Sequence, residues 1–386
     1  MTLKRAILAT LAAISVVIGA GLTVLGQAPA ARPPVGAVPT FQADPTWPPA
    51  LPNNRVMGAV ASVAVDRHGH VWMLHRPRTV AVGLKDRAAP PVLEFDASGK
   101  FIQGWGGPNA AYEWPDNEHG IYVDDKDIVW IGGNAGTGAV LIQPPWRDDD
   151  MLLKFTTQGK FLQQIGRRDQ SGGNKDTKNL KEPADVVVYR KTNEVFVADG
   201  YGNRRVIVLD ANTGAFKRMW GAFGNMPVDG PQAPAPGAAP AANAAAEPPA
   251  LYTEPGPPQF GRPVHALEVS NDGLVYVADR GNGRIQVFTI AGKYLKQLFI
   301  NPRGVPGAVA LSPDPQQQFL YVGDSGNSRI VVVNRKALEV VGEFVKKGSL
   351  SPHHIATDSK GNIYTAETGR GTQRFLFKGM SPKATQ

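Results

Sequence analysis

Three histidines with a shared spacing are the residues of this sequence best suited to chemistry. His119, His265 and His353 each precede a short apolar run by ten residues; the first of these runs begins at Val129. Neutral imidazole is a common zinc ligand, and three protein ligands with an open fourth position are typical of a catalytic zinc. The spacing predicts one zinc site formed by the three imidazoles, provided that the fold brings them together.

The chain repeats a pattern of short β-type runs six times. Each unit has a strand-like run, a Gly or Asn turn, a second run such as Val275-Tyr-Val-Ala-Asp279, a further turn and an Ile/Val-rich third run. Such runs separated by Gly, Asn and Asp are typical of antiparallel meanders. Six units predict an all-β, six-bladed β-propeller, a ring that hides its sheet edges. In such a ring the second, fourth and sixth units lie about 120° apart, so their histidines face one another across the axis.

The repeat also sets the expected domain organisation. The sixth unit ends near Lys378 without a fourth strand, so residues near Phe41 to Trp47 are expected to supply it and close the ring. We therefore predict a propeller over residues 41–386, preceded by a Pro/Ala-rich spacer at 31–40. Residues 227–258 are rich in Pro, Ala and Gly, a composition that buries too little apolar surface to fold. They are expected to form a disordered insertion between blades three and four.

The first 30 residues are typical of an export segment. Lys4 and Arg5 form a positive start, an apolar run follows to Leu25, and Ala28-Pro-Ala30 fits a small-residue cleavage site. The apolar run is also long enough for an uncleaved membrane anchor. Residues 1–30 therefore predict a signal peptide or N-terminal anchor on an exported protein, periplasmic or secreted. A membrane contact is expected only through an uncleaved anchor.

The composition fits one large β domain and argues against a nucleic-acid partner. The 386 residues include 43 Gly and 33 Pro, which suits a protein with many turns. The formal charge is +8, or +6 without Lys4 and Arg5, and no Lys/Arg block is present, so we expect no nucleic-acid binding. There are no cysteines, so stability must come from ring closure and core packing and not from disulfides.

Two departures from the repeat add candidate catalytic residues. The turn after the second run of blade three is one residue longer than its counterparts in blades four and five, and it brings in Tyr201. In blade one the strand-end Asp of the other units is replaced by His75, which is followed by Arg76. A tyrosine near a metal and a cation can have its pKa lowered enough to act as a base, and an Arg offers a fork for a carboxylate. The alternatives are a stacked turn residue for Tyr201 and a surface ion pair for Arg76.

These segments resemble the lyase domain of the peptidylglycine α-amidating enzymes, a six-bladed propeller of the NHL-repeat class. The resemblance rests on His119-Gly-Ile, on Pro352-His353-x-Ile and on residues 199–206 and 277–288, and it runs over most of the chain after the export segment. It implies zinc on the three histidines, Tyr201 as catalytic base and Arg76 as the residue that orients the substrate. The implied reaction splits a peptidyl-α-hydroxyglycine into a peptide amide and glyoxylate.

The sequence also departs from that family. An Asp follows the last zinc histidine in the family and helps to hold a structural calcium, whereas here that position is His354, which weakens the case for calcium. The family's disulfides are absent, with Gly202 in place of a cysteine beside the tyrosine.

Two other functions stay open. A non-catalytic NHL propeller could bind a peptide, a glycan or an envelope protein partner, because fold does not fix function. A metal-dependent hydrolase of the lactonase kind would carry acidic calcium ligands at the channel, whereas histidines there favour zinc.

Overall fold

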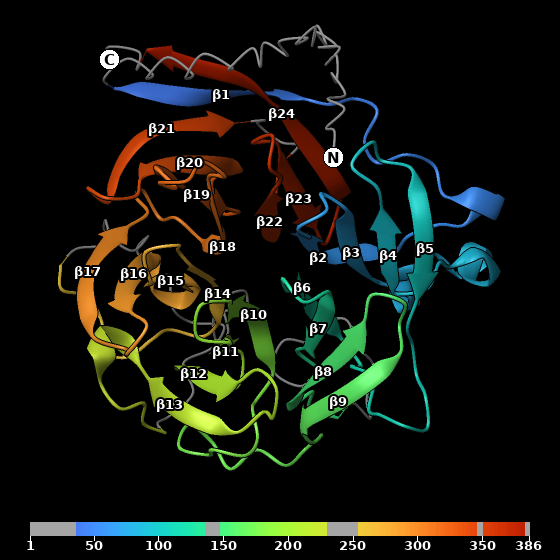
Figure 1. Ribbon diagram of the computed structural model, residues 1–386, viewed down its shortest axis with the longest axis horizontal. Coiled ribbons are helices and arrows are strands. Elements are labelled where there is room, and N and C mark those ends of the chain that lie inside the picture. The colour runs from blue at the N-terminus through green and yellow to red at the C-terminus, as the bar shows by residue number, and fades with distance from the viewer. Residues whose placement is uncertain (1–35, 136–146, 230–253, 346–349, 383–386) are drawn as a thin grey trace, which may run out of the picture. The chain divides into compact units, whose positions relative to one another are not determined.

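Six four-stranded antiparallel sheets surround a central axis as the blades of a propeller (Figure 1). The structure is a computed structural model and describes residues 36–135, 147–229, 254–345 and 350–382. All of them belong to one unit of the chain, Gly36–Gln386. The predicted all-β six-bladed β-propeller is confirmed.

Blades one to five each follow the chain from an inner to an outer strand. Blade one contains β2 (Ala59–Val65), β3 (Val71–Arg76), β4 (Val92–Phe95) and β5 (Phe101–Trp105). Blade two contains β6 (Glu118–Val123), β7 (Ile128–Gly133), β8 (Met151–Thr156) and β9 (Phe161–Gly166). Blade three contains β10 (Pro183–Tyr189), β11 (Glu194–Asp199), β12 (Arg205–Asp210) and β13 (Phe216–Trp220). Blade four contains β14 (Val264–Val269), β15 (Leu274–Asp279), β16 (Arg284–Thr289) and β17 (Tyr294–Phe299). Blade five contains β18 (Pro306–Leu311), β19 (Phe319–Asp324), β20 (Arg329–Asn334) and β21 (Glu339–Val345).

Blade six joins the two ends of the propeller. It contains β22 (His354–Thr357), β23 (Ile363–Glu367), β24 (Gly371–Pro382) and, as its outer strand, β1 (Ala37–Ala43). β1 pairs with β24, so the expected ring closure by an N-terminal strand is present, but the strand begins at Ala37, inside the predicted spacer, and ends at Ala43. Trp47 lies beyond the end of β1. Its indole packs between blades one and six, against Phe95 and Tyr364.

Helices are short in the described part of the chain. They are the 3₁₀ helices η1 (Pro52–Asn54), η2 (Pro77–Thr79), η3 (Val82–Arg87), η4 (Ala222–Gly224) and η5 (Arg280–Asn282). Within the described ranges, no helix has the length and apolar character needed to cross a bilayer. The predicted export segment at 1–30 lies outside the described residues, as does most of the predicted insertion at 227–258.

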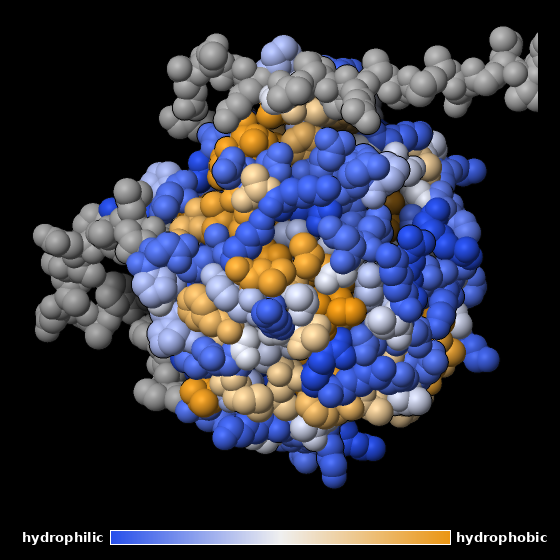
Figure 2. Space-filling view, turned by 60° about the vertical axis from the view of Figure 1, so that its left-hand side comes forward, coloured by the Kyte–Doolittle hydropathy of each residue, from blue (hydrophilic) through white to orange (hydrophobic). Residues whose placement is uncertain are grey.

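The hydrophobic core lies between neighbouring blades, where second-strand aromatic residues are buried. The indole of Trp72 donates to Asp66 over 3.0 Å, and the indole of Trp130 makes the same bond to Asp124. On the face shown in Figure 2 hydrophilic residues cover most of the described surface, with hydrophobic residues scattered among them. The apolar side chains thus pack one blade against the next and leave the polar backbone of the inner strands to line the axis.

Buried ion pairs fix the turns at one end of the channel in blades three to five. In blade four the Asp279 carboxylate accepts from Arg284 over 2.7 Å and from the backbone N–H of Gly261 over 2.8 Å. Blades three and five repeat the pair, from Asp199 and from Asp324. We call this end of the propeller the arginine face.

In blade one His75 replaces this Asp and takes over its contact with the entering chain. His75 Nδ1 accepts from the N–H of Gly58 over 3.1 Å, and Nε2 donates to the carbonyl of Pro90 over 2.9 Å. Burial lowers the pKa of His75 to about 4, so the ring is neutral near pH 7. His75 thus keeps the turn in place without the buried ion pair that blades three to five contain.

Candidate metal centre

Backbone bulges on the inner strands direct the three predicted histidines to the axis. The pairing of β6 with β7 shifts register at His119, and that of β14 with β15 shifts at His265. His353 lies directly before β22. A bulge re-aims a side chain that would otherwise alternate with its neighbours. The same irregularity therefore turns the histidines of blades two and four inward.

The odd-numbered blades have the same bulge with a small residue in it. β2, β10 and β18 shift register at Ala61, Ala184 and Gly307. Imidazoles and small residues thus alternate around the axis. This alternation leaves room in a narrow channel for three rings.

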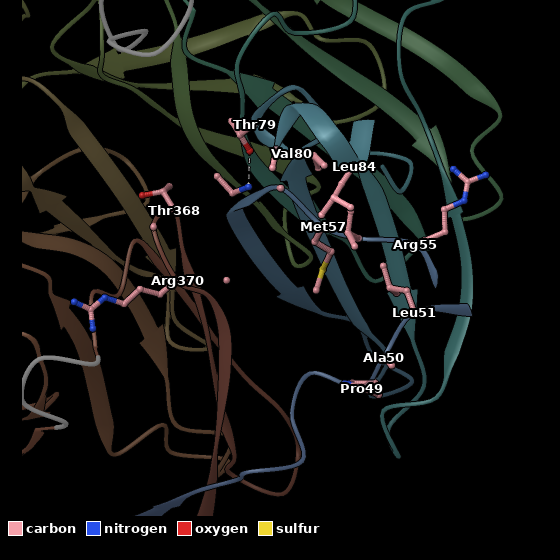
Figure 3. A pocket seen from close by; sticks show the side chains of 16 residues that line it. Pro49, Ala50, Leu51, Arg55, Met57, Thr79, Val80, Leu84, Thr368 and Arg370 are labelled. Atoms are coloured by element: carbon pink, nitrogen blue, oxygen red, sulfur yellow. Dashed lines mark hydrogen bonds between the residues drawn. The ribbon is translucent and has the colours of Figure 1, made fainter. Parts of the chain in front are cut away.

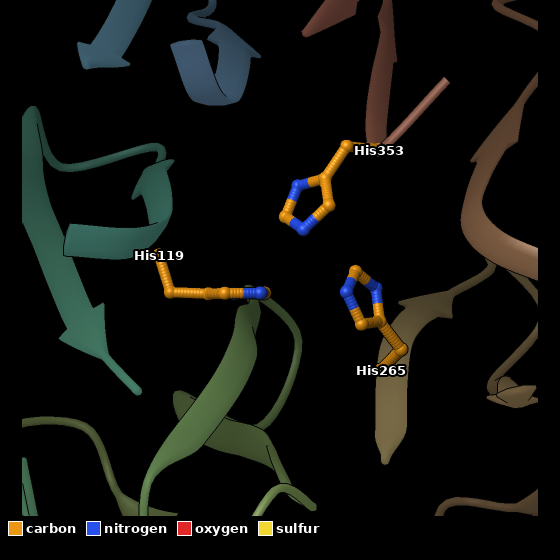
Figure 4. A group of neighbouring side chains, drawn as sticks. All are labelled: His119, His265 and His353. Atoms are coloured by element: carbon orange, nitrogen blue, oxygen red, sulfur yellow. The ribbon is translucent and has the colours of Figure 1, made fainter. Parts of the chain in front are cut away.

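The three imidazole rings converge on one region of the axis (Figure 4). One ring nitrogen of each lies within 4.8 Å of the other two, and the ring centroids are 4.7 to 4.9 Å apart. The rings come from blades two, four and six. The convergence expected from the repeat is present in the structure, while the bound zinc stays a prediction.

A backbone carbonyl of the next blade fixes each ring. His119 Nδ1 lies 2.7 Å from the carbonyl oxygen of Ala184, and His353 Nδ1 lies 2.7 Å from that of Ala61. His265 Nδ1 makes the same contact with Gly307. Because a carbonyl only accepts, each Nδ1 carries the proton, and each Nε2 lone pair is left facing the axis. Carbonyl partners of this kind orient metal-ligating histidines.

The converging lone pairs fit a metal cation better than a hydrogen-bonded cluster. The Tyr201 hydroxyl lies 3.0 Å from His119 Nε2 and 3.1 Å from His265 Nε2. One hydroxyl proton cannot satisfy three acceptors that point at each other, and a buried acceptor without a partner costs about 1–3 kcal/mol. Burial lowers the pKa of all three imidazoles well below the usual range, so protonation does not relieve the clash near neutral pH. The donor set is that of a three-histidine zinc site.

Tyr201 reaches this centre from the longer turn of blade three. Its ring packs edge-on against His119 and His265. Burial raises the pKa of Tyr201, while the positive charges of Arg280 and Arg76 lower it. The two arginines thus act in the direction that the base role requires, but without a metal ion the net shift is upward, opposite to the lowering expected from the sequence.

Arg76 lies at the same end of the channel. Its Nε donates to the carbonyl of Glu118 over 2.8 Å, which fixes the guanidinium across the gap between blades one and two. Burial lowers the pKa of Arg76 to about 10, so the side chain stays charged at pH 7. The Arg76 charge also lowers the pKa of His119 and His353, so the guanidinium lies near these two candidate ligands. The surface ion pair considered as an alternative does not describe this buried side chain.

Arg280 is a further candidate site residue, which the sequence pattern did not single out. It follows Asp279 in blade four, and its charge lowers the pKa of Tyr201, His265 and His353. The repeat holds the signal, because Arg280 occupies the strand-end position that Arg76 occupies in blade one. Two arginines therefore flank the tyrosine on the arginine face.

His354 differs from its expected orientation. Because successive strand residues alternate, the sequence predicts the His354 side chain on the far side of the strand from that of His353. Instead, His354 Nε2 lies 3.2 Å from Asp185 Oδ1 of blade three, although neither ring nitrogen has hydrogen-bond geometry to a partner. Asp185 is on β10, the inner strand of blade three, so His354 also reaches into the channel. An imidazole here does not supply the oxygen ligands that calcium requires, so we derive no calcium site.

A second group of possible ligands lies outside the channel. Asp66, His70 and Glu94 of blade one offer atoms within 4.8 Å of one another. Asp66 already accepts from the indole of Trp72 and from two backbone N–H groups, and His70 bonds directly to Glu94 over 2.7 Å. These bonds satisfy the group without a metal.

Known proteins resemble this chain in its repeat and over most of its sequence. A family model described as the NHL repeat matches residues 265–288. Human NHL repeat-containing protein 3 is 26% identical over 308 residues, which cover 75% of this chain and 73% of that protein. Rat peptidylglycine alpha-amidating monooxygenase is 25% identical over 335 residues, which cover 82% of this chain but only 30% of that protein. The chain therefore spans less than a third of the length of this relative.

Two further comparisons concern a lyase sequence and a solved fold. Peptidyl-alpha-hydroxyglycine alpha-amidating lyase 1 of Drosophila melanogaster is 26% identical over 392 residues, which cover 90% of this chain and 62% of that protein. A streptogramin B lyase structure matches with a TM-score of 0.51 at 13% identity, covering 88% of this chain and 98% of that chain, and shows the fold alone. The chain is thus a six-bladed β-propeller with an NHL repeat, and it resembles the peptidyl-α-hydroxyglycine amidating lyases in sequence.

Proposed function

We propose that this protein is a zinc-dependent lyase of the peptidyl-α-hydroxyglycine α-amidating type. The observation that carries the proposal is the set of three carbonyl-oriented imidazoles with Tyr201 against two of them. Arg76 and Arg280 add positive charge on the same side. A metal site, a proton acceptor and a carboxylate-binding group are the three parts that this reaction needs.

The chain's own residues account for the proton transfers. The substrate carries an amide N–CH(OH)–carboxylate unit. Tyr201, as a phenolate, takes the hydroxyl proton as the oxygen forms a carbonyl and the C–N bond breaks, and it then returns this proton to the departing amide nitrogen, which restores the phenolate. The products are a peptide amide and glyoxylate, so atoms and charge balance. Zinc held by His119, His265 and His353 would act as a Lewis acid that makes the hydroxyl more acidic.

Arg76 binds the carboxylate end of the reacting unit. A guanidinium and a carboxylate form charge-assisted hydrogen bonds, often as a parallel pair. Arg76 is held by the Glu118 carbonyl through Nε, which leaves its two terminal nitrogens for such a pair. Arg76 orients the substrate carboxylate, and Arg280 keeps the Tyr201 hydroxyl in a positive environment that favours loss of its proton.

We also propose that the protein acts outside the cytoplasm. The support is the sequence of residues 1–30, with its positive start, apolar run and small-residue site. A small peptide-like substrate in the periplasm or medium is the corresponding partner.

Glyoxylate release is the experiment that tests this function. Zinc-loaded protein is incubated with an acyl-peptidyl-α-hydroxyglycine, and glyoxylate and peptide amide are measured in equal amounts. Arg76→Ala should raise KM about 10- to 100-fold for substrates with a free carboxylate, the scale of a lost charge-assisted hydrogen bond. The control is Arg67→Ala, which removes an exposed arginine paired with Asp127 and should leave KM unchanged.

A second candidate follows from one comparison. Human NHL repeat-containing protein 3 matches 75% of this chain, against 82% for the rat amidating enzyme, and its name states no reaction. A non-catalytic propeller that binds a peptide, glycan or envelope protein is therefore the alternative. Zinc-loaded protein that releases no glyoxylate from any hydroxyglycine peptide would contradict the lyase and favour this alternative or the metal-dependent hydrolase.

A further inference from the structure

A pocket of about 650 Å³ lies between blades six and one (Figure 3). One wall contains the apolar side chains of Leu51, Met57, Val80 and Leu84. The other wall is formed by residues 368–371, which are the turn between β23 and β24 and the first residue of β24. Its volume is in the usual range for small-molecule and side-chain pockets, and an apolar lining with few polar groups is typical of a binding site.

The apolar wall is built by a connection that is longer than the repeat requires. Residues 77–91 join β3 to β4 in blade one, whereas residues 280–283 suffice for the equivalent connection in blade four. The longer connection contains η2 and η3, and the Leu84 side chain in η3 is 36% exposed. Ordered loops of extra length on a rigid scaffold often carry binding residues.

The pocket shares its wall with the candidate active site. Thr79 Oγ1 donates to the carbonyl of Arg76 over 2.8 Å and accepts from the N–H of Ala59 over 2.7 Å. A Cβ atom on Gly58 would lie 2.0 Å from the same carbonyl. Across the pocket, Thr368 follows the last residue of β23 and so occupies in blade six the strand-end position of Arg76. The pocket therefore opens on the arginine face, beside the proposed carboxylate site.

The separation along the inner strand suits a peptide. Ala59 lines the pocket, and the carbonyl of Ala61 orients His353. Two residues of β-strand span about 7 Å. An extended peptide covers about 3.3–3.6 Å per residue, so this offset along the strand equals about two peptide residues.

We propose that this pocket binds the apolar side chain of the first or second residue before the reacting hydroxyglycine, which makes peptides with an apolar C-terminal region the substrate class. The proposal rests on the proposed lyase function. Arg76 holds the carboxylate, the metal centre holds the hydroxyl carbon, and the peptide extends from there into the groove between blades six and one.

The test compares three substrates that differ only in one side chain. Acyl-Ala-Leu-, acyl-Leu-Ala- and acyl-Ala-Ala-α-hydroxyglycine are assayed for glyoxylate release. One of the two Leu substrates should have a kcat/KM about 10-fold above that of the Ala-Ala substrate, the usual scale for filling an apolar pocket. Equal kcat/KM for all three would overturn the pocket proposal and leave the lyase standing.

Two pocket variants and their matched controls locate the preference. Leu84→Asn makes the wall polar with the same branching and number of non-hydrogen side-chain atoms, and Gly369→Phe fills the pocket from a position where an added Cβ meets nothing within 4 Å. Each should reduce the Leu preference to about 2-fold or less. Val82→Asn is on the same 3₁₀ helix but 89% exposed, and Gly83→Phe also has a Cβ position without neighbours within 4 Å; neither residue lines the pocket. Both controls should keep the preference, and loss of the preference in the controls alone would refute the assignment.

A binding measurement separates this proposal from the lyase. The amides acyl-Ala-Leu-NH2, acyl-Leu-Ala-NH2 and acyl-Ala-Ala-NH2 are titrated by calorimetry against wild type and Gly369→Phe. Tighter binding of a Leu amide that Gly369→Phe removes, in a protein that releases no glyoxylate, supports the pocket and rejects the lyase. Equal binding of all three amides by a protein without glyoxylate release rejects both.

Discussion

Blades two and four contain the same inner-strand bulge as the odd blades and use it in a different way. Blades two and four place His119 and His265 in it, and both side chains are fully buried at the axis. Blade three places Ala184 there, and its carbonyl orients the ring of His119. The comparison shows that a bulge can supply either a side-chain ligand or the backbone group that holds a neighbouring ligand. Each proposed metal ligand thus depends on the next blade.

The largest expected effect comes from removing an even-blade imidazole. His265→Ala should abolish stoichiometric zinc binding and lower kcat/KM by about 10³-fold or more, since a metal contributes several kcal/mol to such a transition state. The control is His68→Ala, whose ring is half exposed on blade one beside Asp127. Metal analysis and glyoxylate assays follow both variants. Full zinc binding by His265→Ala would show that the even blades do not form the site.

Removing the tyrosine hydroxyl should affect the reaction and spare the metal. Tyr201→Phe deletes the group that contacts His119 and His265 Nε2. We expect kcat to fall by about 10² or more, the scale of a lost general base, with unchanged zinc content. Unchanged kcat would rule out Tyr201 as the base, and a loss of zinc would assign it a role in holding the metal.

An odd-blade carbonyl can be displaced without touching a ligand. A Cβ atom on Gly120 would lie 2.7 Å from the carbonyl oxygen of Ala184, the partner of His119 Nδ1. Gly120→Ala should therefore weaken zinc binding by about 10- to 100-fold, as loss of such an orienting partner usually does. Gly83→Ala is the matched control, because its Cβ would meet nothing within 4 Å. Equal zinc affinity of both variants would remove the odd blades from the account.

The smallest expected effect concerns a contact between blades that is remote from the histidines. Glu194 of blade three bonds to Arg218, which also donates to the carbonyl of Ile290 in blade four. The Arg218 hydrogen bonds lower the pKa of Glu194 from 4.5 to about 2. A depressed carboxyl pKa contributes stability that is present above pH 4.5 and is lost as the pH falls from 4.5 towards 2.

Urea unfolding measures this contribution. Glu194→Gln should lower the free energy of unfolding by about 1–2 kcal/mol at pH 7, with the difference disappearing near pH 2. Glu343→Gln, at a more exposed ion pair with Arg329, should cost less than about 0.5 kcal/mol. Zinc content should not change in either variant. A loss of zinc in Glu194→Gln would contradict the view that the inner-strand bulges alone position the ligands.

The repeat made the fold and the convergence of the histidines predictable, because equivalent positions in a closed ring must share a radius and a height. The same register contained Arg280 at the Arg76 position, but a single arginine in a Gly-Asn turn looks like an ordinary turn residue. The bulges at His119 and His265 left no clear mark in the sequence, and strict alternation gave the wrong side for His354. The roles of Ala61, Ala184 and Gly307 were also hidden, because a carbonyl that orients a ligand leaves no trace in residue type.

The closing strand shows a similar limit. The missing fourth run of blade six predicted that another segment supplies its outer strand. The first and last residues of that strand, however, depended on packing. Phe41 packs against Tyr321 and Phe344 of blade five, and Trp47 packs against Phe95 of blade one. Tertiary contacts of this kind override local composition, which is why the strand begins inside the Pro/Ala-rich segment.

The metal content of the purified, folded protein tests the central claim most directly. After incubation with zinc and removal of the excess, elemental analysis should find about one zinc per chain in wild type and in the His68→Ala control, and far less in His265→Ala. Wild-type protein that unfolds cooperatively as a β-protein yet retains no zinc would contradict the account.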